Sequence, residues 1–459
     1  MSTDQPQAPE TAPPAPTASP GPGAAGAGAA APGRLRRIAR GALADIGPLR
    51  DIPDYRRVWF GQTVSSVGQQ MTAVAVAVQV WDLTRSSFAT GLVGLFSLVP
   101  LVTFGLWGGA IADTVDRRRL GLIGSAGLAA VSVLLAGQAL LGLHVVALLY
   151  AAVALQAGFF ALSSPARSSM IPRLVPREQL PAANALNTVS MNLGMTVGPM
   201  LGGLLIGAFG AQSAYLFDAV AFSATLYAMW RLPAMKPQSE GGDGGDGGDG
   251  GGRKGRASVL DGLRFLATRP NLRTSFLADL AAMIFGLPRA LFPAIAVGFY
   301  GGGAGTVGLL VAAPAVGALA GALFSGWIGR VHRHGAAVLA AVAAWGLAIA
   351  AFGVVRELWL GLALLAAAGC ADTISMIFRN TITQVAAPDD MRGRLQGIFI
   401  VVVAGGPRLG DFESGTVAAL ASSVTISVVT GGLACVAAVL LLAARRPAFL
   451  RYDSRNPTP

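Results

Sequence analysis

The sequence predicts an all-α integral membrane protein with twelve transmembrane helices in two pseudo-symmetric six-helix bundles. Hydrophobic residues make up 53% of the 459-residue chain, charged residues only 12%, and the mean hydropathy is +0.59. A soluble domain carries about a quarter charged residues, so this composition indicates a bilayer protein. The apolar residues fall in long runs, and the pattern of the first half recurs in the second.

Twelve apolar runs are long enough to cross the hydrocarbon core, which takes about 20 residues of helix. In chain order, we place the helices at residues 58–81, 88–112, 120–142, 145–168, 184–210, 213–232, 275–298, 304–328, 336–355, 357–382, 394–420 and 424–444.

The two halves repeat one plan at a distance of about 210 residues. A small-residue helix end that runs into a basic loop at 108–119 recurs in degraded form at 325–334. Arg167, nine residues before a proline, is matched by Arg379, nine residues before another. Duplicated halves with a shared hydropathy plan are typical of transporters.

Low-complexity segments flank and separate the two bundles. We assign residues 1–49 to a disordered cytoplasmic N-terminal tail, 50–232 to the first bundle and 271–445 to the second. Residues 233–270, with their Gly-Gly-Asp triplets, form a flexible cytoplasmic linker, and 446–459 form a cytoplasmic C-terminal tail.

The arginines predict how the chain lies in the membrane. With the N-terminus inside, the outward loops carry only Arg85 and Arg356, whereas the inward loops carry many arginines. Because cytoplasmic loops are enriched in Lys and Arg, we expect both termini in the cytoplasm. The net charge of +11 then reflects orientation rather than nucleic-acid binding. A bias to Ala, Gly and Arg, with only two lysines, indicates a GC-rich bacterial genome. For such a chain of apolar spans we expect a multi-pass protein of the bacterial inner membrane.

The loop between the second and third predicted helices carries Gly109, Asp113, Arg117 and Arg118. A carboxylate beside a helix end that bridges to a basic residue can form a breakable latch, which stabilises one of two rocking states. Alternatively, these charges only set the membrane topology.

The fifth predicted helix contains a tract of small residues, Gly194, Gly198, Pro199, Gly202 and Gly203. Glycines four residues apart allow a neighbouring backbone to approach closely, and the proline bends the helix. Alternatively, the tract is a packing seam of the kind found in any helical bundle.

Ionisable residues inside predicted spans are candidates for substrate or proton binding, because each is costly in lipid. These residues are Asp279, Arg289, Asp372, Arg408, Asp411 and Glu413. We expect the proton-titrating group to be among Asp372, Asp411 and Glu413, with Arg289 or Arg408 as the counter-charge. Alternatively, Arg408 and Asp411 neutralise each other as an i,i+3 pair. Arg379 lies close enough to the inner surface to snorkel.

A polar stripe follows the first predicted helix through Gln62, Ser65, Gln69 and Thr72. Such a stripe would line a wet central cavity. Helix-to-helix hydrogen bonding is the alternative interpretation.

These motifs resemble the major facilitator superfamily. Gly109, Asp113, Arg117 and Arg118 match its signature G-x-x-x-D-(R/K)-x-G-R-(R/K), although Thr114 and Asp116 depart from the usual residues. The tract 194–203 is similar to the antiporter motif of drug:proton exporters in that superfamily. Segments 61–65, 79–81, 172–176 and 392–394 further resemble its enterobactin exporter branch.

The resemblance covers residues 50–445 and implies a proton-driven exporter of a small organic molecule, with a siderophore as the expected substrate. It implies a monomer, no bound cofactor or metal, and a latch that holds the outward-open state. The segment 154–158 lacks the arginine that many drug:proton antiporters place before its glycine, so another group must couple the proton.

Other functions remain open on the sequence. The chain could be a macrolide or multidrug efflux pump of the same superfamily, or an importer. From another class, it could be a membrane receptor or regulator that does not transport. An enzyme is disfavoured because no His or Cys cluster, Ser/His/Asp set or carboxylate pair at useful spacing is present.

Overall fold

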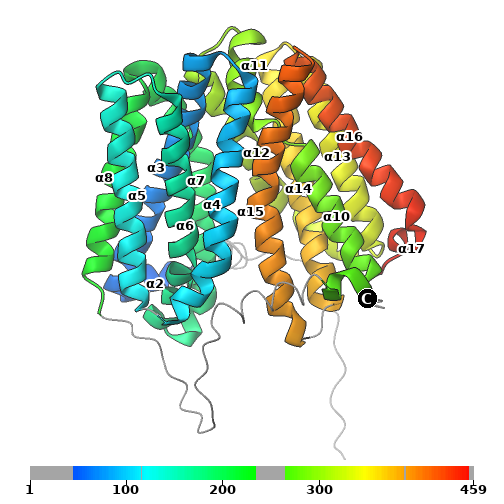
Figure 1. Cartoon of the computed structure of the whole chain (residues 1–459). Coiled ribbons are helices and arrows are strands. Elements are labelled where there is room, and N and C mark those ends of the chain that lie inside the picture. Colours follow the sequence, from blue (N-terminus) through cyan, green and yellow to red (C-terminus); the bar gives the residue numbers. More distant parts are fainter. Residues whose placement is uncertain (1–44, 115, 234–263, 387–388, 454–459) are drawn as a thin grey trace, which may run out of the picture. The chain divides into compact units, whose positions relative to one another are not determined.

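The structure is a computed structural model that describes residues 45–114, 116–233, 264–386 and 389–453. Within these ranges the description of side chains leaves out residues 106–114, 169 and 389–401. Figure 1 shows the described part as long helices that run roughly parallel to one another. The predicted all-α membrane fold of two six-helix bundles is confirmed.

The first bundle contains six long helices. The first helix starts with a proline at its first position. The third is capped by Asp116, whose side chain accepts hydrogen bonds from the backbone N–H groups of Arg118 and Arg119. Gly210, with φ of +81°, separates the last two helices. The helices are α3 (Pro53–Thr84), α4 (Ser87–Thr114), α5 (Arg117–Leu140), α6 (Val146–Leu174), α7 (Leu180–Phe209) and α8 (Ala211–Trp230).

The second bundle follows the same plan, but its first span is broken. That span consists of α10 (Pro270–Phe285), a 3₁₀ turn η2 (Arg289–Leu291) and α11 (Phe292–Gly298). The span predicted over 275–298 lies within a candidate membrane span at Pro270–Gly298, but it is not one continuous helix, because Gly286 and Pro288 interrupt the hydrogen-bond ladder. The remaining spans are α12 (Ala304–Leu323), α13 (His334–Val354), α14 (Leu358–Ala386), α15 (Asp389–Leu420) and α16 (Val424–Arg445).

The packing of the helices confirms the internal repeat. In the first bundle, α3 packs against α7 and α8, α5 against α6 and α8, and α4 against α6. The corresponding pairs of the second bundle are α10 with α15 and α16, α13 with α14 and α16, and α12 with α14. Between the bundles, α4 packs against α15 and α7 against α12.

In the described residues, nine spans are long and apolar enough, by length and composition, to cross a membrane. The other three long helices are α3, α8 and α15. These helices carry Gln, Ser, Thr, Asp and Arg side chains inside their spans. Polar side chains are kept in a membrane helix where they face the bundle interior or a partner, so these three helices direct attention to the interior.

Several predicted boundaries change. The eighth predicted span ends at Leu323 rather than 328, because a 3₁₀ segment η3 (Ser325–Arg330) follows. Residues 264–268, inside the predicted flexible linker, are helical, and Leu266 among them is buried. Short helices α2 (Gly47–Asp51) and α17 (Pro447–Leu450) extend into the predicted tails, and Phe449 of α17 is buried.

We call the end of the bundles where α3 begins and α16 finishes the terminus-side end, which lies at the bottom of Figure 1, and the opposite end the far end. Two seams of small residues join the bundles toward the far end. A Cβ added to Gly308 of α12 would lie 3.1 Å from the Cα of Gly203 on α7. One added to Gly91 of α4 would lie 3.1 Å from the Cα of Gly415 on α15.

The α7–α12 seam predicts a difference between two glycines on one helix. A Cβ at Gly203 would lie 2.6 Å from the carbonyl oxygen of Ala304, whereas nothing lies within 4 Å of one at Gly207. Because carbon atoms need about 3.5 Å, Gly203→Ala must push the helices apart. We expect a longer far-end distance between spin labels at Leu141 and Leu420 in Gly203→Ala, measured by electron double resonance.

The matched control Gly207→Ala should leave that distance distribution unchanged. If both variants behave like the original chain, α7 and α12 do not pack as tightly as described.

Candidate functional site

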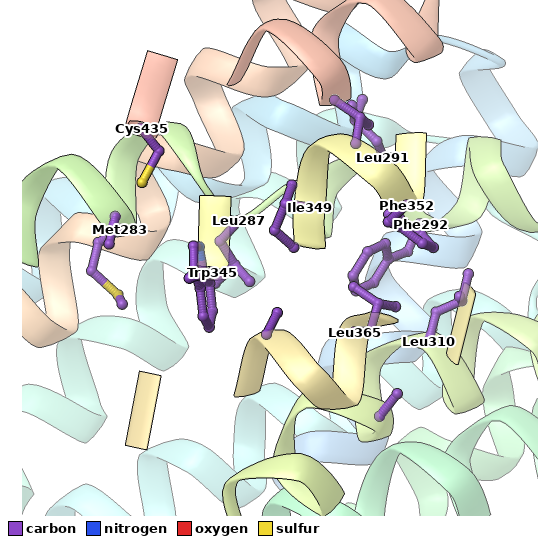
Figure 2. Packing of buried hydrophobic residues seen from close by; sticks show 14 of the residues in the cluster. Met283, Leu287, Leu291, Phe292, Leu310, Trp345, Ile349, Phe352, Leu365 and Cys435 are labelled. Atoms are coloured by element: carbon purple, nitrogen blue, oxygen red, sulfur yellow. The ribbon is translucent and has the colours of Figure 1, made fainter. Parts of the chain in front are cut away.

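The break in the seventh span is held open by a buried tryptophan. Trp345 of α13, 4% exposed, donates its Nε1–H to the carbonyl oxygen of Gly286 at 2.8 Å. Figure 2 shows Trp345 beside Leu287, with Phe292 and Phe352 farther along the same core. This hydrogen bond satisfies a carbonyl that the helix leaves unpaired, so packing of the core stabilises the break.

Charged side chains gather next to this break. Asp279 of α10 forms an ion pair with Arg379 of α14, and the two side chains are 2% and 6% exposed. Arg379 also contacts Asp372, two turns earlier on the same face of α14, at 3.7 Å from Nη2 to Oδ1. The expectation that Arg379 snorkels to the inner surface is therefore wrong, because a buried carboxylate on α10 holds its guanidinium inside the bundle.

A third carboxylate lies on α15 and contacts the break directly. Asp411 accepts a hydrogen bond at Oδ1 from the backbone N–H of Ala290 in η2, at 3.1 Å. Arg289, the preceding residue, interacts electrostatically with both Asp411 and Asp372. The charge of Arg289 therefore acts on a carboxylate of α14 and on one of α15.

Arg408 and Asp411 interact electrostatically but do not form the simple i,i+3 ion pair that was the alternative. In the described side chains, the Asp411 carboxylate bonds to the broken span, and the Arg408 guanidinium donates to the carbonyl oxygen of Ala404 on its own helix. We name the connected set of Asp279, Arg289, Asp372, Arg379, Arg408 and Asp411 the charged cluster.

Five of the six ionisable residues expected to form the site belong to this cluster, and Glu413 does not. Glu413 follows Asp411 by two residues, so it points to a different face of α15. Its neighbour Phe412 packs against Phe88 of α4, with ring centroids 6.2 Å apart.

The small-residue tract on α7 contacts two helices. Cβ atoms added to Gly194, Gly198 and Gly202 would collide with Ser66, Gln70 or Val67, and Met71 of α3. Gly203 instead faces α12, and the carbonyl oxygen of Pro199 lies against Gly308 there. The tract therefore lets α7 approach one helix within its own bundle and one helix of the other bundle.

The predicted latch is described only in part. Arg118 donates from its guanidinium to the carbonyl oxygens of Met229 and Trp230, at the end of α8 in its own bundle. Arg117 is partly exposed. The side chains at Gly109 and Asp113 lie outside the described residues, so the bridge between the carboxylate and a basic residue stays a prediction.

The polar stripe of α3 does not line a cavity as a unit. Ser65 is 1% exposed, donates to the carbonyl oxygen of Ala221 at 3.0 Å and lies 2.6 Å from the Thr225 hydroxyl of α8. For Ser65 the alternative, helix-to-helix hydrogen bonding, is correct. Gln62 and Gln69 are partly exposed.

One buried carboxylate was missed by the sequence analysis. Asp218 of α8 is 0% exposed and accepts hydrogen bonds at Oδ2 from Ser132 of α5 (2.7 Å) and Thr72 of α3 (3.0 Å). The sequence could have identified it, because Asp218 lies inside the predicted span 213–232 and an ionisable residue is costly within a membrane span.

A pocket of about 470 Å³ opens at the far end between the bundles. Its lining includes Gln79 and Asp82 of α3, Gln138 of α5, Val297 of α11 and Val307 of α12. Within the described part of the chain, no group of three or more His, Cys, Asp or Glu side chains could hold a metal ion.

A family model described as transmembrane secretion effector, within the major facilitator superfamily, matches residues 43–457. The chain belongs to this family. It is 30% identical over 409 residues to the enterobactin exporter EntS of Citrobacter koseri, and equally to that of Escherichia coli. Each match covers 87% of this chain and 94% of the relative.

Solved structures show the same fold as this secretion-effector chain. A POT family transporter in complex with 5-aminolevulinic acid is 11% identical with a TM-score of 0.68, covering 87% of this chain and 97% of that one. The nucleoside transporter NupG is 14% identical with a TM-score of 0.65, covering 87% and 100%. Family and fold together make this a multi-pass transport protein of the bacterial inner membrane.

Breaking the buried ion pair should destabilise the protein strongly. Arg379→Gln leaves Asp279 buried without its cation, which costs about 3–5 kcal/mol. We expect Asp279→Asn combined with Arg379→Gln to recover most of that loss, because neither charge then remains. Thermal unfolding of the purified protein in detergent measures both.

Arg57→Gln is the control, because it breaks an exposed ion pair with Asp54 (2.8 Å) that is worth about 0–1 kcal/mol. A double variant as unstable as Arg379→Gln alone would contradict the pairing.

Removing the indole donor should loosen the break. Trp345→Phe leaves the buried carbonyl of Gly286 without its hydrogen bond, at a cost of about 1–3 kcal/mol. We expect faster deuterium uptake in the peptide spanning 286–291, measured by mass spectrometry. Trp359→Phe, at a position 68% exposed, should leave that peptide unchanged. Equal uptake in both variants would show that Trp345 does not hold the break.

Proposed function

We propose that the protein exports a small organic molecule, a catecholate siderophore of the enterobactin type, from the cytoplasm in exchange for protons. It does so by alternating access between the two bundles. The observation that carries the proposal is the charged cluster, which connects the broken seventh span to α14 and α15 through carboxylates that protonation would neutralise.

Proton coupling is supported by how the carboxylates are held. Asp411 bonds to the backbone N–H of Ala290, and Asp372 contacts Arg379 at 3.7 Å. When such a carboxylate takes up a proton, it loses its attraction to Arg289 and becomes a weaker acceptor. Protonation of Asp411 or Asp372 thus releases the broken span from α15 or α14. Deprotonation restores the contact, so the proton selects between two packings of the second bundle.

Alternating access is supported by the two seams. With both termini in the cytoplasm, as the arginines predict, the far end is the outer end. Both glycine contacts between the bundles, Gly203 with Gly308 and Gly91 with Gly415, lie toward that end. Backbones that meet without intervening side chains can separate without unlocking interdigitated residues. In this arrangement the seams hold the bundles together toward the outer end, where the far-end pocket lies, and rocking about the seams would widen that end.

The substrate class rests on the relatives. Proteins 30% identical over 87% of this chain are named enterobactin exporters, which favours a catecholate siderophore. A macrolide or another drug remains the alternative, because cavity side chains rather than the fold choose the ligand. A non-transporting receptor or regulator could have the same fold, but such a function would not require the charged cluster.

Transport in inside-out vesicles with an acidic lumen tests the proposal. We expect enterobactin, but not erythromycin, to accumulate, and accumulation to stop when the gradient is collapsed. Asp372→Asn and Asp411→Asn should each abolish the gradient-driven part, because a neutral amide cannot release a proton. Scintillation counting of labelled compounds measures the uptake.

Asp54→Asn, at an exposed surface pair, is the matched control and should transport normally. Uptake of erythromycin alone would make the protein a drug pump. Enterobactin uptake that ignores both the gradient and the two variants would contradict proton exchange.

A further inference from the structure

Buried polar side chains form a column along the interface of α3, α5 and α8, in the first bundle. One layer joins Ser65 and Thr225, and the next joins Thr72, Ser132 and Asp218. A third layer joins the side chains of Gln79, Gln138 and Tyr215. On α3 these positions are seven residues apart, which is two helical turns, so they lie on one face.

Asp218 is the single carboxylate of this column, and one of its two carboxylate oxygens has no hydrogen-bond partner among the described residues. Oδ2 accepts from the hydroxyls of Thr72 and Ser132, but Oδ1 is buried and finds no hydrogen-bond partner among the described residues. Its nearest neighbour across the interface is Gly68, where an added Cβ would meet Oδ1 at 2.5 Å. Two hydroxyl donors on one oxygen leave the other as the place for a proton.

No cation neutralises Asp218 in the described part of the first bundle. The side chains that face it are Thr72 from α3 and Ser132 from α5, opposite Gly68, and neither is titratable. The titratable group within one turn on α8 is the phenol of Tyr215, which is itself buried and donates to Gln79. A buried carboxylate normally has an ionic partner or carries a proton, and the described side chains offer Asp218 no ionic partner.

The third layer of the column lies between Asp218 and the far-end pocket along the chain of α8 and α3. Tyr215 lies one turn before Asp218 on α8, and its hydroxyl donates to Gln79 Oε1 at 2.8 Å. Gln138 donates to the same oxygen at 2.9 Å, and both Gln79 and Gln138 line the pocket. Ordered water that bridges Asp218 to these hydroxyl and amide groups would complete a path for the proton.

We propose that Asp218 is a proton-binding site of the first bundle, separate from the charged cluster, and that it exchanges its proton with the far-end pocket through Tyr215, Gln79 and Gln138. In the bound form Oδ1 carries the proton and Oδ2 keeps both hydroxyl donors. On release, the proton leaves Oδ1 for the pocket and the carboxylate retains the electron pair.

The proposal deepens the proposed function, because it adds a second proton to an exporter that uses protons. The two sites differ in chemistry. Carboxylates of the charged cluster face arginines, so a proton there competes with ion pairs. Asp218 faces only neutral donors, so its proton depends on burial and on access from the far end.

Infrared spectroscopy of the purified protein in lipid at neutral pH tests the site without any transported compound. We expect the original chain to show a carboxylic-acid C=O stretching band that Asp218→Asn removes. The amide of Asn keeps an acceptor for Thr72 and Ser132 and fits the same space. Asp54→Asn, an exposed control, should retain the band. An unchanged spectrum in Asp218→Asn would show that Asp218 is ionised and overturn the proposal.

Two further variants cover the case in which Asp218→Asn does not fold. Thr72→Val and Ser132→Ala keep the carboxyl group and remove one hydrogen bond each, so the band should stay and shift to higher frequency. A band that ignores both variants does not belong to Asp218 and would overturn the assignment.

The proton path through Tyr215, Gln79 and Gln138 is tested separately. The measured quantity is the rate at which the carboxylic-acid C=O band of Asp218 shifts when the protein is transferred to D₂O. We expect Gln138→Leu to slow this exchange several-fold, because leucine interrupts the column. Gln179→Leu, a change at a partly buried position of the terminus-side end, should not alter it. Equal rates in the two variants would overturn the route through the pocket. None of these measurements depends on enterobactin transport, so failure of the proposed function is recognised separately.

Discussion

Placing a carboxylate inside a bilayer is the constraint on which the rest of this structure depends. Lipid offers no water to solvate the charge, so each buried acid must meet a cation, accept hydrogen bonds or hold a proton. The second bundle meets this requirement with arginines: Arg379 pairs with Asp279 and contacts Asp372, and the charge of Arg289 acts on both Asp372 and Asp411. The first bundle meets it with hydroxyls around Asp218.

The broken seventh span follows from the same constraint. A continuous helix would satisfy every backbone group internally and offer nothing to Asp411. The interruption at Gly286 and Pro288 frees the N–H of Ala290 to bond that carboxylate, and Trp345 satisfies the carbonyl left behind. Backbone polarity is thus exposed only toward the bundle interior, where side chains complete it.

The bundle interiors depend on polar side chains, whereas the contacts between the bundles at the glycine seams are made mainly by backbone atoms. Gly203 against Gly308 and Gly91 against Gly415 bring backbones together without interlocking. The bundle interiors, by contrast, are fixed by ion pairs and directed hydrogen bonds. Rigid bundles joined by smooth seams are suited to move as two bodies, and a charge change inside one bundle can alter how it meets the other.

The sequence by itself determined the twelve helices, their duplication and five of the residues of the charged cluster. Polar groups are costly in lipid, so membrane spans appear in the sequence as long apolar runs, and a single charge within such a run marks a functional candidate. It could not decide partners. The tertiary structure alone placed Arg379 inside the bundle rather than at its surface, turned Ser65 toward α8 rather than a cavity, and gave Asp218 its two donors. Those outcomes depend on which faces of distant helices meet, and hydrophobic periodicity within one helix does not encode that.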